Sequence, residues 1–423
     1  MYSMSLIGDR RWFLTLLIAL GLTGCGEKVL DQTPLLRVGT SGDYAPFSFE
    51  NEAGELVGFD IELAKRFAAD NQMELEFTRF QWPDLLKDLA ANKFDVAMSG
   101  VTVREDRSLA ARSTVPTTKS GAVVIVPKDS KVATMGDLDH VGIRIGVNEG
   151  GHLERVARKA FSKATIVTSL DNQAVPEMLL AGEIDALVTD TMEVPHWLKR
   201  LEGATALSPF TQDRKAWLVH PEKVELADQL DSWLLGIEKD GTFGELRQEH
   251  LPDGYNDQTA APLTALLAAM DERLSLMVGV AESKRVLGKS VEDLEQETRV
   301  LSAAVEGVTV EAQRQGIPIP NQQRVTDFFK SQIEAAKAIQ YRVLSGPATT
   351  LDPPDLVTDL RPALGRISRR INHLIVGLGD DGDLTDPVSL RLMVDEALTN
   401  RSLSSEHLTA ISSAIYKLEK TQP

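Results

Sequence analysis

The stretch MDERLSLMVGVAESK, residues 270–284, and the later stretch SQIEAAKAIQY, residues 331–341, predict the fold of the C-terminal part. Arg273 and Lys284 are eleven residues apart, about three helical turns, so they share a helix face with Met277 and Ala281. In the second stretch an apolar helical face carries, every four residues, Gln332, Ala336 and Gln340. Buried cations are costly unless an anion meets them. The pattern predicts a helical bundle that receives a small dianion, or an ordinary bundle whose Arg and Lys reach water at the core edge.

Roughly the last 160 residues resemble the secreted, all-helical class of chorismate mutases, whose pattern is RL...VA..K, D..RE..L and QIEA.K.IQ. The resemblance implies substrate binding by Arg273, Lys284 and Gln340, with Arg370 from GRISRRIN as a further cation. It also implies substrate-binding positions at two acidic residues of VEDLEQETRVL, Asp293 and Glu297. Two positions depart from the family: Gln296 replaces an arginine, and Ala336 replaces a small hydroxyl residue.

The reaction that this resemblance implies is the rearrangement of chorismate to prephenate, which needs no nucleophile, acid or base. It needs two carboxylates to be clamped in a near-attack shape and donors to meet the charge that develops on the ether oxygen. Lys284 and Gln340 are the expected catalytic donors.

Composition limits the remaining possibilities. The chain has 423 residues, of which 43% are hydrophobic, and a formal net charge of -17. This length predicts two or three domains, and the acidity argues against binding to nucleic acid. A site for anionic substrates must therefore gather local cations.

The N-terminus reads as an export signal, with Arg10 and Arg11 before an apolar run over residues 12–22. The following Leu-Thr-Gly-Cys looks like a lipobox ending at Cys25, the chain's one cysteine. We therefore expect residues 1–25 to be a lipoprotein-type signal peptide and the protein to be periplasmic, with Cys25 lipidated as its attachment to a membrane. The paired arginines also resemble a twin-arginine signal, so the export route stays open.

From about residue 26 to residue 255, short apolar strands alternate with amphipathic helices, as in α/β proteins. A second series of strands begins near Ala122 and predicts a second lobe, with a return to the first lobe near Lys215 and a ligand in the cleft between them. Residues 256–262 read as a linker. An all-α domain over residues 263–423 follows, with helices expected near 292–315, 321–345, 355–377 and 387–418.

The α/β part resembles periplasmic amino-acid-binding proteins, through LRVGTSGDYAPFSF, GELVGFDIELAKRFA, DVAMSGVTVREDR and IGVNEGG. Within that group it looks most like cyclohexadienyl dehydratases, which convert prephenate to phenylpyruvate and arogenate to phenylalanine. The resemblance implies that Glu193 in TDTME is the general acid and that Asn148 binds near the leaving hydroxyl. The acid needs a pKa raised to roughly 6 to 7, by burial or by a neighbour such as Asp190.

The same resemblance implies that Arg107 pairs with a substrate carboxylate. Other expected contacts surround that pair and the ring: Ser99, Thr102, Trp82, Tyr44, Asp43, Asp190 and Lys215. Each has a plainer interpretation as a core or surface residue. His152 departs from the family, which has a hydroxyl residue there.

Together these features predict a bifunctional exported enzyme of phenylalanine biosynthesis, with chorismate, prephenate and arogenate as ligands. The alternative is a lipid-anchored amino-acid receptor of a transporter, fused to a weakly active mutase, with Asp190 pairing an α-ammonium. We assign no cofactor and no metal, because the acidic segment over residues 379–387 lacks the ligand spacing of an EF-hand. The sequence leaves open homo-oligomer formation, channelling and the choice between prephenate and arogenate.

Overall fold

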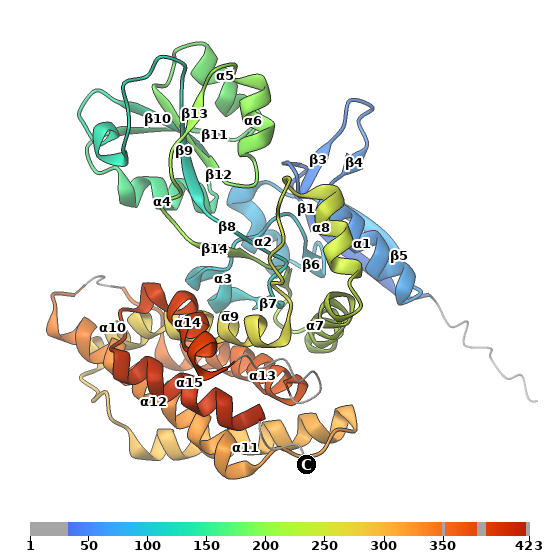
Figure 1. Cartoon of the computed structure of the whole chain (residues 1–423), viewed down its shortest axis with the longest axis vertical. Coiled ribbons are helices and arrows are strands. Elements are labelled where there is room, and N and C mark those ends of the chain that lie inside the picture. The colour runs from blue at the N-terminus through green and yellow to red at the C-terminus, as the bar shows by residue number, and fades with distance from the viewer. Residues whose placement is uncertain (1–32, 349–351, 379–385, 420–423) are drawn as a thin grey trace, which may run out of the picture.

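The computed structural model describes residues 33–348, 352–378 and 386–419 of the chain. The expected signal peptide with Cys25, and most of the acidic segment over residues 379–387, lie outside the described residues. Figure 1 shows a two-lobed α/β part, as predicted, stacked on an all-α part. Within the described ranges, no helix combines the length and the apolar composition needed to cross a bilayer.

The first lobe is built on a five-stranded sheet in the order β5-β1-β6-β15-β7. Its central pairs are parallel, and β15 runs antiparallel to both of its neighbours. The strands are β1 (Leu35–Thr40), β5 (Glu74–Arg79), β6 (Val96–Ala97), β7 (Arg112–Ser113) and β15 (Leu218–Val219). A small antiparallel sheet joins β2 (Asp43–Tyr44), β3 (Ser48–Glu50) and β4 (Leu56–Val57). The helices of this lobe are α1 (Phe59–Asp70), α2 (Leu85–Ala90), α3 (Glu105–Ala110), α7 (Val224–Lys239) and α8 (Thr242–His250).

The second lobe has its own sheet, in the order β11-β10-β12-β9-β13. Its strands are β9 (Ala122–Val126), β10 (Arg144–Asn148), β11 (Thr165–Ser169), β12 (Ala186–Asp190) and β13 (Thr205–Ala206). Three helices cover it: α4 (His152–Ala160), α5 (Ala174–Leu180) and α6 (Val194–Arg200). Strand β9 is buried along its whole length, which explains its continuous apolar sequence AVVIV.

Two antiparallel strands, β8 (Thr118–Ser120) and β14 (Asp213–Lys215), carry the chain between the lobes. The second lobe therefore starts just before Ala122, and the chain re-enters the first lobe after Lys215, as the sequence predicted. Because side chains alternate along a strand, Lys215 faces the cleft while Arg214 faces the helical part.

The all-α part contains α9 (Pro262–Ser275), α10 (Met277–Leu287), α11 (Leu294–Gln315), α12 (Gln322–Ser345), α13 (Arg361–Gly377), α14 (Pro387–Ala397) and α15 (Ser405–Glu419). A π-helical turn over Leu356–Leu360 precedes α13, and a short 3-10 turn over Thr399–Arg401 divides the last expected helix into α14 and α15. Gly288 and Gly316 end α10 and α11 in the left-handed conformation, where glycine avoids a steric cost.

The helical part packs against the first lobe, and the buried apolar side chains of the two form one connected core. Polar contacts reinforce the boundary: Arg366 donates to the carbonyl oxygens of Ser108, Leu109 and Ala111. On the side of the connecting strands, Arg214 pairs with Asp271 of α9 at 2.7 Å. The all-α part is thus joined to the first lobe and to one connecting strand.

Candidate functional site

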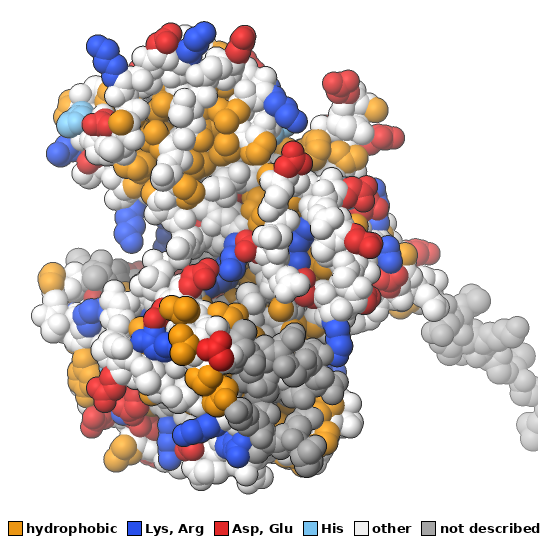
Figure 2. Space-filling model, in the orientation of Figure 1, with side chains coloured by type: hydrophobic (Ala, Val, Ile, Leu, Met, Phe, Trp, Pro, Cys, Tyr) orange, Lys and Arg blue, Asp and Glu red, His pale blue; other side chains and the backbone are white. Residues whose placement is uncertain are grey.

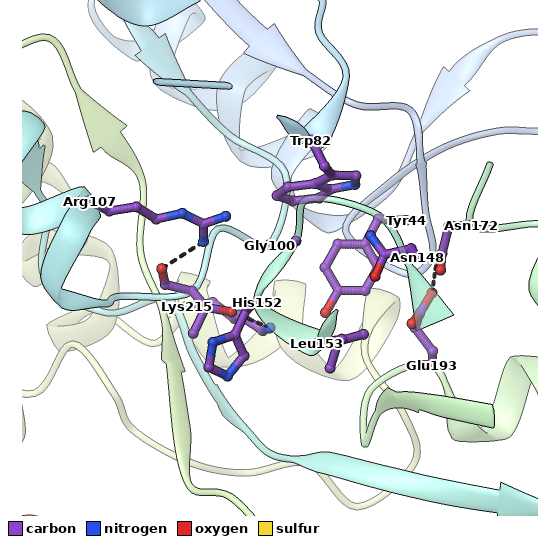
Figure 3. A pocket seen from close by; sticks show the side chains of 12 residues that line it. Tyr44, Trp82, Gly100, Arg107, Asn148, His152, Leu153, Asn172, Glu193 and Lys215 are labelled. Carbon is purple, nitrogen blue, oxygen red and sulfur yellow. Dashed lines mark hydrogen bonds between the residues drawn. The ribbon is translucent and has the colours of Figure 1, made fainter. Parts of the chain in front are cut away.

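A small cavity of about 20 Å³ lies between the two lobes. Its lining comes from both lobes and from the connecting strand β14 (Figure 3): Tyr44, Trp82, Gly100, Thr102, Arg107, Asn148, Gly151, His152, Leu153, Asn172, Glu193 and Lys215. Seven of these were expected from the sequence. The cavity lies at the carboxyl ends of β10 and β12, where ligands bind in open α/β sheets.

Glu193 is fully buried at the start of α6, directly after the carboxyl end of β12. Its carboxyl oxygens accept hydrogen bonds from Asn172 Nδ2 at 2.7 Å and from Thr189 Oγ1 at 2.6 Å. Burial, helped by the charge of Asp190, raises the pKa of Glu193 to about 8 against these two donors. The side chain is therefore mainly protonated at neutral pH, and it can give a proton to a ligand.

Arg107 lies at the other end of the cavity from Glu193, with the rings of Tyr44 and Trp82 between them (Figure 3). Its Nη1 donates to the Thr102 carbonyl at 2.8 Å, and its Nε has no partner among the described residues. Burial lowers the pKa of Arg107 to about 9, which leaves the guanidinium charged at neutral pH. A buried cation with an unused donor suits a ligand carboxylate.

Lys215 joins the cavity to a polar cluster behind it. Its ammonium contacts Asp190 Oδ2 at 2.8 Å and donates to Thr102 Oγ1 at 2.8 Å. Asp190 is completely buried and does not line the cavity itself. The Lys215 ammonium therefore occupies the place beside Asp190 where we expected a group of the ligand.

Two further expected residues also lie behind the cavity wall. Ser99 Oγ bonds Ser41 Oγ at 2.8 Å, so its hydroxyl points away from the cavity lining. The carboxylate of Asp43 accepts from Trp82 Nε1 at 3.3 Å and so orients the indole. Both residues support the site from outside its lining.

The lobes touch each other around the cavity. The backbone oxygen of Asp43 in the first lobe accepts from Asn172 Nδ2 at 3.3 Å and from Gln173 Nε2 at 3.0 Å in the second. Gly150 has φ +73, and a Cβ there would lie 2.6 Å from Pro83 Cγ, so glycine permits this close approach. The structure is therefore in a closed form, in which the cavity is shielded from water.

Sequence reasoning missed Asn172, which holds Glu193 and bridges the lobes. It follows β11, and its place after a strand in the turn-rich run SLDNQ was the available signal. His152 Nε2 lies 3.0 Å from Asp213 Oδ2 on β14. The imidazole that replaces the family's hydroxyl residue therefore contacts a carboxylate of this chain.

The helical part holds a second group of buried polar side chains. Arg273 is 6% exposed, and neither its Nε nor its Nη1 has a partner among the described residues. Burial lowers its pKa to about 10, and it remains charged. Gln332, on the neighbouring helix α12, is fully buried with both amide atoms unpaired within the described residues. Buried groups without partners are costly, which favours an interaction with a ligand.

Gln340 lies two turns after Gln332 on α12 and reaches the helix that follows Arg273. Its Nε2 contacts Met277 Sδ at 3.7 Å, and its buried Oε1 has no partner in the described chain. Met277 is the first residue of α10, directly after the end of α9, the helix that carries Arg273. Lys284 donates to the Val291 carbonyl at 2.8 Å, and burial lowers its pKa.

Three expected members of this second site have partners within the chain. Arg370 pairs with Glu272 and donates to the carbonyl oxygens of Ser113 and Thr114, so it lies at the boundary with the first lobe. Asp293 is the N-cap of α11 and accepts from Gln296 N at 3.0 Å. Glu297 Oε2 lies 3.6 Å from Lys337 Nζ. The partners of Arg370 and Glu297 are distant in the sequence, whereas the cap of Asp293 is a local contact.

A wide groove with about 2060 Å³ of empty space separates the second lobe from the helical part. Basic side chains flank this hollow on both sides in Figure 2. Helix α9 contributes the face with Asp271 and Ser275 to the groove, whereas Arg273 is not part of its lining. Arg273 therefore does not face this groove.

Comparisons with known proteins agree with this architecture. Residues 36–253 match the family model of the bacterial extracellular solute-binding proteins, family 3. The cyclohexadienyl dehydratase of Pseudomonas aeruginosa is 31% identical over 229 residues, which are 53% of this chain and 84% of that protein. The ABC transporter arginine-binding protein 1 of Escherichia coli is 29% identical over 223 residues, covering 51% of this chain and 90% of that protein.

A solved structure is also similar to the α/β part. The crystal structure of an ancestral amino acid-binding protein, a precursor of cyclohexadienyl dehydratase, has 30% sequence identity and a TM-score of 0.50. The match covers 52% of this chain and 96% of that one. With more than half of its residues matched by the family model, this chain belongs to the bacterial extracellular solute-binding proteins, family 3.

Proposed function

We propose that the α/β part is a prephenate or arogenate dehydratase that acts in the periplasm, attached to a membrane through a lipid on Cys25. The observation that carries the proposal is a protonated Glu193 and a charged Arg107 at opposite ends of one closed cavity. In prephenate the side chain with its carboxylate and the leaving hydroxyl are attached to opposite (para) carbons of the ring. The similarity to the P. aeruginosa dehydratase supports the same reaction.

In the proposed mechanism Arg107 binds the side-chain carboxylate, and Tyr44 and Trp82 pack against the ring. Glu193 gives its proton to the ring hydroxyl, the C–O bond breaks, and water leaves. The electrons for the new ring double bond come from the bond to the ring carboxylate, which departs as CO2. Asn148 lines the cavity with a buried Oδ1 that has no partner in the described chain, and its amide would orient the leaving hydroxyl.

Lobe closure supports this chemistry in two ways. Removal of water keeps the pKa of Glu193 high, and it disfavours the charged ring carboxylate relative to CO2. Incubating the purified protein with prephenate and reading the absorbance of phenylpyruvate in base tests the proposal. Turnover that disappears in Glu193→Gln supports it, and absence of turnover by the wild-type protein rejects it.

We further propose that the helical part is a chorismate mutase that uses Arg273, Gln332 and Gln340, with Lys284 nearby. Among the described residues, the Gln332 amide and two nitrogens of Arg273 are buried without partners, and Gln340 adds a second buried amide, which fits a dianionic ether. The test is consumption of chorismate, followed by NMR, by the wild-type protein and by Arg273→Ala. Unchanged chorismate with the wild-type protein would reject this second activity.

The placement of the two sites favours release of the intermediate into solvent. Arg273 is absent from the lining of the groove that leads to the second lobe, whereas Asp271 and Ser275 of the same helix line it. Prephenate made in the helical part would therefore have to pass around α9. We propose independent sites linked by local concentration, without a closed passage.

The second candidate for the α/β part is an amino-acid receptor of a transporter, favoured by the similarity to the arginine-binding protein of E. coli. A receptor has no need of the protonated acid at position 193. Calorimetric titration with L-arginine separates the two functions: tight binding without any prephenate turnover would favour the receptor.

A further inference from the structure

Lys215 and Asp190 form a closed ion pair at the wall of the cavity. Their exposed fractions are 2% and 0%, and Nζ lies 2.8 Å from Oδ2. Asp190 Oδ2 also accepts from Ser120 Oγ at 2.9 Å, and Oδ1 accepts from the backbone N–H of Met192 at 2.9 Å. Both oxygens of this carboxylate therefore have partners within the chain, and its charge is balanced.

Lys215 lies on the same side of the cavity as Arg107, which binds the substrate's side-chain carboxylate in the proposed mechanism (Figure 3). Lys215 and Arg107 converge on Thr102, one on its hydroxyl and the other on its carbonyl oxygen, each at 2.8 Å. Figure 3 shows both cations on the side of the cavity away from Glu193. A substituent next to the bound carboxylate is thus placed beside two positive charges.

This is the position at which the two dehydratase substrates differ. Prephenate carries a keto oxygen next to its side-chain carboxylate, and arogenate carries an ammonium group there. A keto oxygen accepts hydrogen bonds from Lys215 or Thr102. An ammonium group would be repelled by the cations and would find Asp190 already neutralised.

We propose that the Lys215–Asp190 pair makes the cavity select an α-keto acid over the corresponding α-amino acid, so that prephenate is the substrate and arogenate is rejected. This inference rests on the proposed dehydratase function. Lys215 acts as a built-in replacement for the ammonium of an amino-acid ligand, which also separates this cavity from that of an amino-acid receptor.

The test uses the product pair phenylpyruvate and L-phenylalanine, which differ only in the keto or ammonium group and do not react further. Calorimetry on the full-length protein should show phenylpyruvate binding on the order of 100-fold more tightly. Lys215→Met frees Asp190 and should reduce this ratio by about tenfold or more. Asp190→Asn leaves Lys215 unpaired and should keep or increase the ratio. Lys119→Met, on the adjacent strand and outside the cavity, is the matched control and should leave it unchanged.

A fall in the ratio for Lys215→Met but not for Asp190→Asn distinguishes selection from a purely structural role, which would change both affinities by the same factor. Equal wild-type affinities for the two products would overturn the inference, as would a uniform loss in Lys215→Met. If Lys215→Met does not fold, the wild-type ratio decides alone.

Measuring the turnover of prephenate and of arogenate with the same preparations separates the proposed dehydratase function from the proposed selectivity for the keto acid. No turnover of either substrate rejects the dehydratase, while the product affinities still report on the ion pair. Equal turnover of both substrates leaves the dehydratase intact and rejects the selection.

Discussion

Replacing Glu193 with Gln removes the carboxyl proton that the residue can transfer. The substitution keeps the shape of the side chain and an oxygen that can accept the hydrogen bond from Asn172. If Glu193 is the general acid, kcat for prephenate should fall by about 10² to 10⁴, the usual contribution of such a group. KM should change little, because Arg107 still holds the carboxylate. The rate is read as phenylpyruvate absorbance in base.

The pH dependence gives a second measure of the same group. Its pKa of about 8 means that wild-type activity should be nearly constant around neutrality and fall about tenfold per pH unit above about pH 8. The residual activity of Glu193→Gln should lack this fall. A wild-type profile that stays level well above pH 8 would contradict the assignment.

Stability should respond to the same pKa. The folded pKa lies above the reference value of 4.5, so the proton-linked stabilisation is complete below about pH 4.5 and is lost as the pH rises to about 8. Relative to Glu193→Gln, the wild-type protein should lose about 2 kcal/mol of unfolding free energy between pH 5 and pH 7. Urea unfolding at the two pH values measures this, with the exposed Glu202→Gln as the control that should show no such divergence.

Three further predictions test the other contacts. Arg107→Lys loses the planar fork, so KM for prephenate should rise by about 10- to 100-fold with a smaller change in kcat, and an unchanged KM in steady-state kinetics would count against carboxylate binding. Arg273→Met removes a buried unpaired cation, so thermal unfolding should show a gain of about 1 kcal/mol while chorismate consumption is lost and prephenate dehydration persists; parallel loss of both activities would contradict separate sites. Glu272→Ala leaves Arg370 buried without its carboxylate, so urea unfolding should show a loss of about 3 kcal/mol, whereas the exposed Glu406→Ala should cost almost nothing.

Much of the lining of the interlobe cavity was expected from the resemblance of short sequence motifs to periplasmic amino-acid-binding proteins, and these motifs lie at strand ends and turns. Glu193 comes directly after β12, Asn148 ends β10, and Arg107 lies on α3 just after a turn. A parallel sheet brings such positions to one edge whatever the distant parts of the chain do. The alternation of strands and helices likewise predicted two lobes and the crossing near Lys215.

The partner of each charged group was not predictable in the same way. Helical periodicity indicated that Arg370 faces inward, and only the packing of the helical part on the first lobe gave it Glu272 and two carbonyl oxygens as partners.

The sequence by itself thus determined the two-lobed and helical architecture, because periodicity is a local property of the chain, and the resemblance of its motifs to a known family indicated Glu193 and Arg107. The tertiary structure alone decided that Lys215 neutralises Asp190, that Asn172 closes the lobes on Glu193, and that Arg370 belongs to a boundary. These contacts join residues far apart in the chain, and burial in a shared low-dielectric interior decides which charges must pair.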